Sequence, residues 1–357
     1  MSNDVLMDAS HQWASRPKDE RYNSLEELYQ ATKAIAARSG ERLIPVEAIR
    51  VEADGGRLFV PGKVRKAQLT HWASGQLAST VGAPASYLRK LPATLAAQCL
   101  NHGLKNMDED GRGPRKLYLT QSADGSRLDL RAITGPDYAR IPHHRAIERW
   151  LAPIVDSHQW EPAPPAMDGS RGLYAGDRDM FAFLVSPNRI DDGTEQGIGR
   201  GLVFYNSDVG AGAIYAKAFG YRFVCGNHMI WGVQDLAEVR FRHVGRAASR
   251  FDLDFKRMIR RYLEQPASVE EEIVKVAQAT RLGKDQETTI AAAAKRTQIP
   301  ANRLVEAYKL ADRSGVDGSP DTVWGLVQGL TRLSQKRTHA GDRMALDRAA
   351  GRLLRAA

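Results

Sequence analysis

The sequence predicts an α+β fold, in which a central, mostly antiparallel sheet has flanking helices and is followed by an all-helical C-terminal region. Two observations lead to this prediction. Residues 198–232 hold the densest β signal of the 357-residue chain, because apolar and aromatic runs alternate there with turn residues. From residue 249 onward the apolar residues instead recur at helical spacing. Runs of strands followed by runs of helices are typical of α+β proteins.

The N-terminal part combines helices and hairpins. Residues 1–22 are polar and predict a mobile arm, after which Ser24 starts a helix that ends near Gly40. Turn residues at 54–56 (Asp-Gly-Gly) and 123–125 (Ala-Asp-Gly) each predict a hairpin. The other elements expected here are helices near 69–81, 87–91, 95–104 and 143–155 and strands at 44–53, 57–60, 116–120 and 127–133. Because residues 160–177 are rich in proline and glycine, we expect a mixed region at 23–160 and a central β region at 176–248.

In the central region, the strands are predicted around polar turns. Apolar runs at 202–205 and 213–218 flank residues 206–212, whose Asn, Asp and Gly accept turn conformations. A third run at 221–225 ends at Gly226-Asn227, another turn dipeptide. We therefore expect structural turn roles for Asn206, Gly210 and Asn227, with each Asn side chain binding backbone at the hairpin ends.

The C-terminal region, 249–357, is predicted to be helical and basic. Ser249 is the expected N-cap of its first helix, with Asp252 at the capping-box position. Further helices are expected at 269–281, 288–296, 301–312, 322–336 and 343–355. Residues 239–357 contain 23 Lys and Arg against 14 Asp and Glu, so this third carries the whole net charge of +9. Clustered positive charge of this kind is typical of proteins that bind polyanions, most often nucleic acid.

The compartment and the membrane class follow from what the sequence lacks. No run of about 18 apolar residues is present, and residues 1–20 have no apolar core like that of a signal peptide. Only Cys99 and Cys225 occur, which argues against a disulfide framework. We expect a cytoplasmic protein with no membrane contact.

One basic cluster is the strongest candidate for binding. Eight basic residues lie between 240 and 261, against only two acids. They are the predicted nucleic-acid-binding residues Arg240, Arg242, Arg246, Arg250, Lys256, Arg257, Arg260 and Arg261. Helical spacing sets several of them opposite an apolar stripe of Phe251, Phe255 and Ile259. Two other interpretations stay open: a solvated basic face that meets an acidic partner, or a helix lying on a membrane surface.

Five motifs, in this order along the chain, resemble a known family. They are Gln76-Leu77-Ala78 with residues 84–92, residues 131–141 (RAITGPDYARI), Asn206-Ser207-Asp208 with Gly210, residues 222–227 (RFVCGN), and residues 323–326 (VWGL). This set is similar to the phage/plasmid-like proteins of unknown function, the DUF932 family, over roughly residues 40–335. The chain departs from that pattern at Asp208-Val209, where similar proteins carry His-Asp before the glycine. The resemblance implies a phage or plasmid context and assigns no reaction.

The chemistry at the end of the third strand has two interpretations. Cys225 and His228 could act as a thiolate nucleophile and its base in an enzyme, with Asn206 and Asn227 lining the pocket. A cysteine that closes an apolar strand is more often a small buried hydrophobe. The pair also has the spacing of half a zinc site, but no second cysteine pair exists, so we expect no metal. No cofactor site is expected either, because the glycines at 197–201 precede a strand rather than a helix.

The sequence thus favours a mobile-element protein that binds nucleic acid, chiefly single-stranded DNA, through its phosphates. Strand annealing or genome handling and assembly into a homo-oligomer are the expected activities. Tyr205, Tyr215 and Tyr221 are candidates for stacking on bases if their side chains are exposed. The alternatives are the enzyme built around Cys225 and His228, and a factor that contacts a host or phage protein through its helical end.

Overall fold

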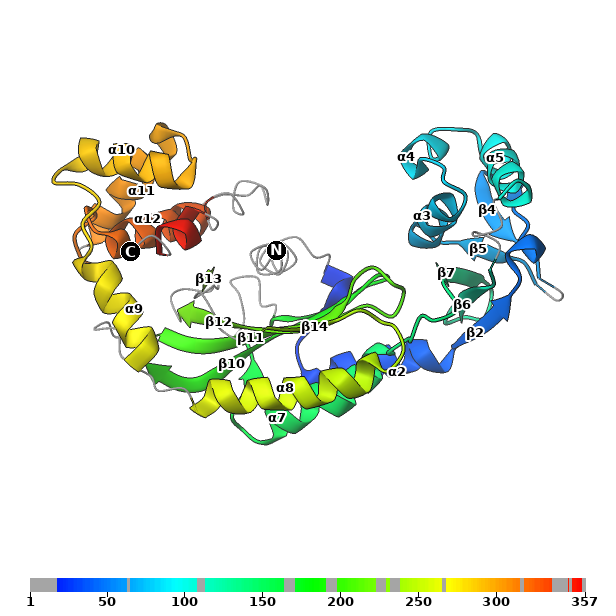
Figure 1. Cartoon of the computed structure of the whole chain (residues 1–357), viewed down its shortest axis with the longest axis horizontal. Coiled ribbons are helices and arrows are strands. Elements are labelled where there is room, and N and C mark those ends of the chain that lie inside the picture. Colours follow the sequence, from blue (N-terminus) through cyan, green and yellow to red (C-terminus); the bar gives the residue numbers. More distant parts are fainter. Residues whose placement is uncertain are drawn as a thin grey trace.

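The computed structural model describes residues 18–62, 65–107, 113–163, 171–190, 198–222, 229–231, 238–264, 268–314, 318–335, 346 and 349–354. Two β-sheets and a C-terminal group of helices follow one another along a crescent, with the larger sheet in the middle (Figure 1). The predicted α+β class is confirmed.

Sheet A, the central sheet, is antiparallel between all its paired strands. Its main order is β1 (Arg21–Tyr22), β9 (Leu173–Ala175), β10 (Met180–Ile190), β11 (Ile198–Asn206), β12 (Ile214–Arg222) and β13 (Met229–Trp231). Two further strands pair with this path: β8 (Glu161–Pro162) with β10, and β14 (Glu238–Phe241) with β12. The predicted hairpin around residues 206–212 is β11–β12, and Gly210 in its turn has a φ of 80°, a conformation that favours glycine.

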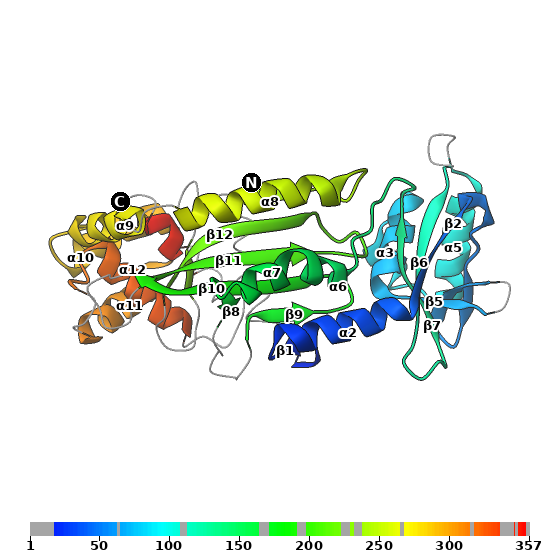
Figure 2. The same ribbon diagram turned by 90° about the horizontal axis from the view of Figure 1, so that it is seen from below.

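Both faces of the central strands are apolar. Alternate side chains of β10 and β11, such as Ala182 and Phe204, face one core, while Phe183 and Val203 belong to a second core. Five helical elements contribute to the first core, and they lie across the same face of the sheet (Figure 2). They are α2 (Leu25–Ala37), the continuous segment α6 (His143–Ala146), η4 (Ile147–Leu151) and α7 (Ala152–Asp156), and α8 (Ala247–Glu264). In this arrangement, α2 and α8 lie over opposite edges of sheet A (Figure 2).

Sheet B, the smaller sheet, carries the N-terminal hairpins. Its order is β2 (Ser39–Ile44), β6 (Arg115–Gln121), β7 (Leu128–Thr134), β5 (Ala67–Leu69), β4 (Arg57–Val60) and β3 (Glu52–Asp54), with only β5–β7 parallel. The helices α3 (His71–Thr80), α4 (Ala85–Leu88) and α5 (Ala93–Lys105) share its apolar core. Two short 3₁₀ helices, η1 (Lys18–Glu20) and η2 (Val46–Ala48), complete the N-terminal part of the described chain. The hairpins predicted at 54–56 and 123–125 are β3–β4 and β6–β7.

The C-terminal helices have a core of their own. They are α9 (Ser268–Ala279), α10 (Gln286–Thr297), α11 (Ala301–Ser314) and α12 (Val323–Gln335), with residues 346 and 349–354 also helical. Trp324 is buried among them, and a Cβ at Gly329 would lie only 2.0 Å from the Ala307 carbonyl oxygen. Because glycine has no Cβ, α11 and α12 pack at backbone contact there.

Helix α8 differs from the prediction at its start and in its packing. It begins at Ala247, so Ser249 lies inside the helix and is not its N-cap. Asp252 makes no capping box; its carboxylate accepts from Trp150 Nε1 at 3.1 Å and from Arg149 Nε at 3.3 Å. The side chain thus joins α8 to the η4 segment, and α8 shares the sheet A core rather than that of the later helices.

The described helices are mostly amphipathic or short. None of them combines the length and the hydropathy needed to span a lipid bilayer.

Candidate functional site

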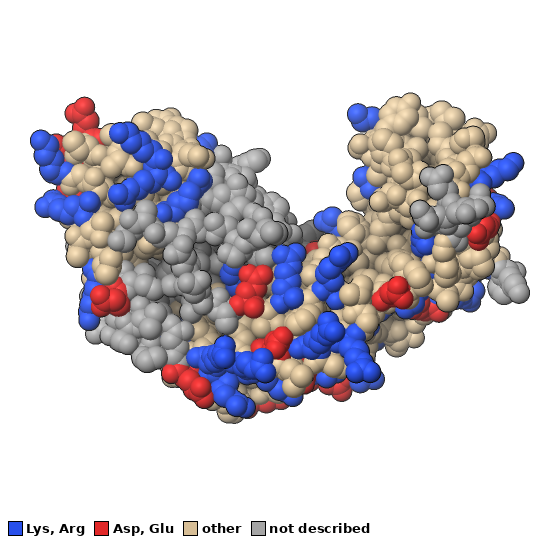
Figure 3. Space-filling model, in the orientation of Figure 1, with Lys and Arg blue, Asp and Glu red and all other residues tan. Residues whose placement is uncertain are grey.

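The eight basic residues predicted to bind nucleic acid are all exposed. They occupy β14, the turn after it and the outer side of α8: Arg240, Arg242, Arg246, Arg250, Lys256, Arg257, Arg260 and Arg261. We call them the basic surface. Lys and Arg side chains gather along α8 and beside β14 in Figure 3. The structure therefore brings the predicted residues together on one side of the molecule.

The two faces of α8 explain this exposure. Five side chains on one face are buried against sheet A: Phe251, Phe255, Met258, Ile259 and Tyr262. The 3.6-residue period of the helix turns the intervening positions outward. Leu253 lies among these outward positions and is 66% exposed, so the outer face is basic with one apolar side chain.

Acidic neighbours neutralise only part of the basic surface. Lys256 Nζ lies 3.1 Å from Asp252 Oδ2, and Arg257 Nη1 lies 3.1 Å from Asp254 Oδ1. Both basic side chains are about two-thirds exposed, so water screens these ion pairs and the attraction within each pair is weak. Within the described part of the chain, the other six arginines of the basic surface have no ion-pair partner. Several guanidinium groups are thus available to an external anion.

The proposed stacking on exposed tyrosines is wrong for the two tyrosines that the structure describes. Tyr205 and Tyr215 are buried, with ring centroids 4.8 Å apart in a stacked pair. They pack with Phe181 and other apolar residues on the face of sheet A opposite α8. Because this second face is also covered, their rings offer no surface to a base. The Tyr221 side chain lies outside the described residues.

Of the residues in the alternative enzyme site, Asn206 belongs to the described part of the chain. Cys225, Asn227 and His228 lie outside the described residues, so the thiolate chemistry and the Asn227 turn stay predictions. Among the residues that are described, no three His, Cys, Asp or Glu side chains are grouped so as to hold a metal ion.

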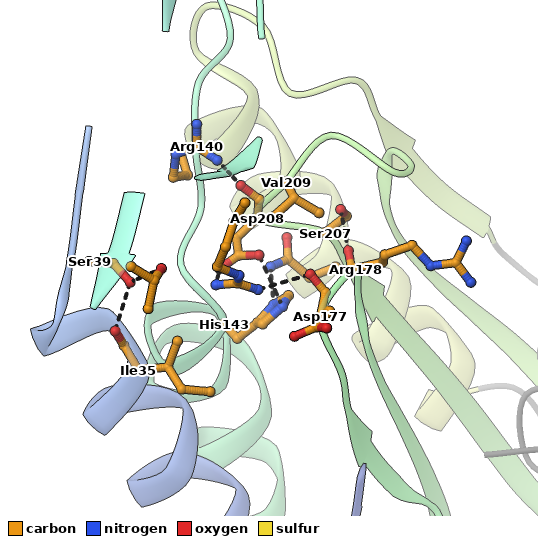
Figure 4. Close-up of polar contacts among 12 residues, drawn as sticks. Ile35, Ser39, Arg140, His143, Asp177, Arg178, Ser207, Asp208 and Val209 are labelled. Carbon is orange, nitrogen blue, oxygen red and sulfur yellow. Dashed lines mark hydrogen bonds and ion pairs between the residues drawn. The ribbon is translucent and has the colours of Figure 1, made fainter. Parts of the chain in front are cut away.

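A second site, not predicted from the sequence, lies where the two sheets meet. Asp208, just after β11 of sheet A, contacts His143 at the start of α6 (Figure 4) and also Arg131 on β7 of sheet B. Asp208 Oδ1 lies 3.4 Å from His143 Nε2, and Asp208 Oδ2 lies 3.5 Å from Arg131 Nη1. All three side chains are at most 8% exposed. We call these three residues the buried polar cluster.

Asn206 fixes the orientation of the histidine. Its Nδ2 donates to His143 Nδ1 and to the Ile141 carbonyl, both at 2.9 Å. Since His143 Nδ1 accepts this bond, the imidazole proton is on Nε2, which faces Asp208. The hydrogen-bond partners of the Asn206 side chain lie 65 and 63 residues away in the chain rather than at the hairpin ends.

Burial and charge act in opposite directions on the cluster. Burial lowers the pKa of His143, so the imidazole is neutral. Burial by itself would raise the pKa of Asp208, but the positive charges of the neighbouring Arg131 and Arg140 outweigh it and hold that pKa below its usual value. Arg140 Nη1 also donates to the Asp208 carbonyl. Asp208 is therefore an ionised carboxylate in a buried site.

The turn after Asp208 is clamped by sheet B's helix α3. The Val209 carbonyl accepts from Trp72 Nε1 at 3.0 Å and from Gln76 Nε2 at 2.8 Å, while Gln76 Oε1 accepts from the Ile133 amide at 2.8 Å. Three of the five motifs that carry the family resemblance thus meet here: residue 76, residues 131–141 and residues 206–210. Their polar side chains hold one sheet against the other.

His243, beside the cluster, should make stability depend on pH. Its ring stacks on Tyr138, with centroids 5.3 Å apart, and burial lowers its pKa to about 4. The unfolded chain binds this proton near pH 6.5 and the folded chain only near pH 4, so stability falls as the pH decreases between these values. We expect this residue to cost about 2 kcal/mol at pH 5 relative to pH 7.5. Urea unfolding at the two pH values measures it.

The matched variants for this measurement are His243→Asn and His102→Gln. His243→Asn removes the titrating group, so the loss between pH 7.5 and pH 5 should shrink by about that amount. His102 is exposed, and its replacement should leave the loss unchanged. An equal pH dependence in wild type and His243→Asn would contradict the prediction.

Sequence reasoning missed the buried polar cluster for a definite reason. Asp208 is 65 residues from His143 and 77 from Arg131. No local spacing pattern connects such positions. The sequence did contain one signal of this site: polar residues at 131–141 and 206–210 interrupt apolar strands within the family motifs. That signal does not show which of these residues contact one another.

Comparisons with known proteins agree with the resemblance. No curated protein and no solved structure matches the chain. A family model, described as "Domain of unknown function (DUF932)", matches residues 132–356, from the end of β7 through the last described helix. The motif residues 76–92 lie outside this match. The match covers well over half of the chain, which therefore belongs to the DUF932 family.

Proposed function

We propose that this protein binds nucleic acid, chiefly single-stranded DNA, through phosphate contacts along the basic surface. The observation that supports it best is that all eight basic side chains are exposed on one side of the molecule, six of them without an ion-pair partner in the described chain. Guanidinium groups suit phosphate because their N–H donors match two phosphate oxygens at once.

The packing of α8 supports a rigid binding surface. The apolar face of this 18-residue helix is buried in the sheet A core, so its outer face is held in place. The helix is about 27 Å long, which lets it reach several consecutive phosphates. With Tyr205 and Tyr215 buried, the proposed contacts are to phosphates rather than to bases, and binding should depend little on sequence. If six phosphates are neutralised on a single strand, log K falls against log salt with a slope of about −4.

Charge reversal on α8 should weaken DNA binding strongly. In the double variant Arg257→Glu/Arg261→Glu, two exposed cations on α8 become anions, which would repel the phosphates of the DNA strand. We expect the affinity for labelled single-stranded DNA at low salt to fall about tenfold or more, and the salt slope to shrink by about 1 to 2. Fluorescence anisotropy over a salt series measures both quantities.

The matched control reverses two exposed charges at the other end of the molecule. Arg42→Glu/Lys90→Glu changes the net charge equally, on β2 and just after α4. A site-specific interaction leaves this variant close to wild type, whereas a general charge effect weakens both variants alike. Unchanged affinity in Arg257→Glu/Arg261→Glu would refute the proposal.

Self-assembly and a role in annealing or handling phage or plasmid DNA belong to the same proposal. Their support is the family resemblance, together with a binding surface that has no sequence readout. Size-exclusion chromatography with light scattering, with and without single- and double-stranded DNA, reports assembly and partner class together.

A further inference from the structure

Two exposed apolar side chains lie within the basic surface. Among the large apolar side chains of the described chain, Leu253 is the most exposed, at 66%, and Val244 is 52% exposed. Val244 lies between Arg242 and Arg246 in the segment that joins β14 to α8, and Leu253 lies on α8 itself. A single exposed apolar side chain is ordinary, but both of these interrupt a run of exposed cations. The surface therefore offers apolar contacts as well as charge.

The helical positions of α8 place Leu253 at the centre of a stripe of arginines. Steps of three and four residues, which keep to one side of a helix, connect Arg246, Arg250, Leu253, Arg257 and Arg260. Arg246 stands just before the helix, but its carbonyl accepts from the Arg250 amide at 3.1 Å, so the first turn includes it. This stripe runs opposite the face on which Phe251 and Phe255 are buried.

The spacing of the stripe leaves a gap between cations at Leu253. With a rise of 1.5 Å per residue, Arg250 and Arg257 are about 10 Å apart along the helix axis, whereas Arg246 and Arg260 lie only about 4.5 to 6 Å beyond them. A strand whose phosphates are held on both sides of this gap passes over Leu253. Within the stripe, the group that meets the strand at this point is apolar.

An apolar side chain suits an unstacked base. Leucine is one of the side chains that insert between bases in protein–DNA complexes, and in a duplex this insertion costs unstacking energy. That cost is smallest for a base that is already single-stranded. A duplex, in contrast, keeps its base faces stacked on one another and presents phosphates to a flat basic face. The apolar contact therefore favours single strands.

A lipid surface fits the same face less well. The binding of an interfacial helix grows with the apolar area that it buries in the membrane. On α8 the wide apolar face is already buried against sheet A, and the outer face carries Leu253 among charged side chains. The charge complementarity of the surface is to a chain of phosphates.

We propose that Leu253 and Val244 pack against base faces of the bound strand, and that this contact makes the basic surface prefer single strands to duplexes. The inference rests on the proposed function, because the arginines must first hold the strand. It leaves binding insensitive to sequence, since every base has a face on which to pack.

Fluorescence anisotropy at low salt tests this proposal, using the full chain and three labelled probes of equal length: oligothymidine, an abasic strand and a duplex. We expect the wild type to bind oligothymidine about three- to tenfold more tightly than the abasic strand, from the apolar area buried. In Val244→Ala/Leu253→Ala this preference should disappear, while affinity for the abasic strand and the duplex stays unchanged. The salt slope should also stay unchanged, because no cation is removed.

The matched control is Leu43→Ala/Leu95→Ala, which truncates two exposed leucines on β2 and α5. It should keep the wild-type preference for oligothymidine over the abasic strand. Equal wild-type affinity for these two strands, or a preference that survives in Val244→Ala/Leu253→Ala, overturns the inference and leaves phosphate binding standing. A wild type that binds none of the probes overturns the inference and the proposed function together.

Discussion

Asp208→Asn should lower the free energy of unfolding by about 3 kcal/mol at pH 7, because it breaks a buried ion pair. The substitution keeps the shape of the side chain but removes its charge. Arg131, whose Nη1 lies 3.5 Å from Asp208 Oδ2, is then left as a buried cation. Its Nη2 still donates to the Asp177 carbonyl, which is a neutral acceptor. Urea unfolding measures the effect as a shift in the midpoint at constant slope.

An exposed ion pair in the same part of sheet B provides the control. Asp129→Asn removes the partner of Arg127, whose side chain is 54% exposed. Water can solvate that guanidinium, so the expected loss is below about 1 kcal/mol. Equal losses in Asp208→Asn and Asp129→Asn would mean that burial does not raise the cost of breaking the pair.

Phe251→Ala should also lower the free energy of unfolding by about 3–5 kcal/mol. The Phe251 ring is fully buried between α8 and sheet A. Its centroid lies 4.9 Å from that of Trp150 and 5.8 Å from that of Phe204, both in edge-on geometry. Removing it leaves a cavity that rigid neighbours can fill only in part. Chemical denaturation followed by tryptophan fluorescence measures the loss.

Leu253→Ala is the matched control, because Leu253 lies two positions after Phe251 on the same helix but faces away from sheet A. Leu253 is 66% exposed, and its truncation should change stability by less than about 0.5 kcal/mol. Because α8 carries most of the basic surface, the proposed DNA binding of Phe251→Ala should weaken at temperatures where α8 is partly unfolded. A stable Phe251→Ala variant would show that α8 does not depend on this core contact.

Much of the fold could be predicted from local patterns. Ser24 starts α2 as expected, with its hydroxyl accepting from the Glu27 amide, and the predicted hairpin turns lie at 54–56 and 123–125. The period of Phe251 and Phe255 identified the buried face of α8, and hence the exposed position of the arginines between them. Such patterns work because helical or strand periodicity depends only on neighbours in sequence.

The errors arose where a local pattern had more than one tertiary solution. Tyr205 and Tyr215 lie in the apolar runs 202–205 and 213–218, and a tyrosine suits either an exposed or a buried face because its ring is apolar and its hydroxyl is polar. In the structure both faces of β11 and β12 are covered, so both rings are buried. Likewise, Ser249 has the chemistry of an N-cap, but the helix extends two residues further toward the N-terminus.

The sequence by itself determined the α+β class, the hairpins, the C-terminal helices and the composition of the basic surface, because each depends on residues close together in the chain. Only the tertiary structure decided which aromatic rings are buried and that Asp208, His143 and Arg131 meet between the two sheets. Contacts across 65 and 77 residues are set by how the sheets pack, and no local spacing encodes that packing.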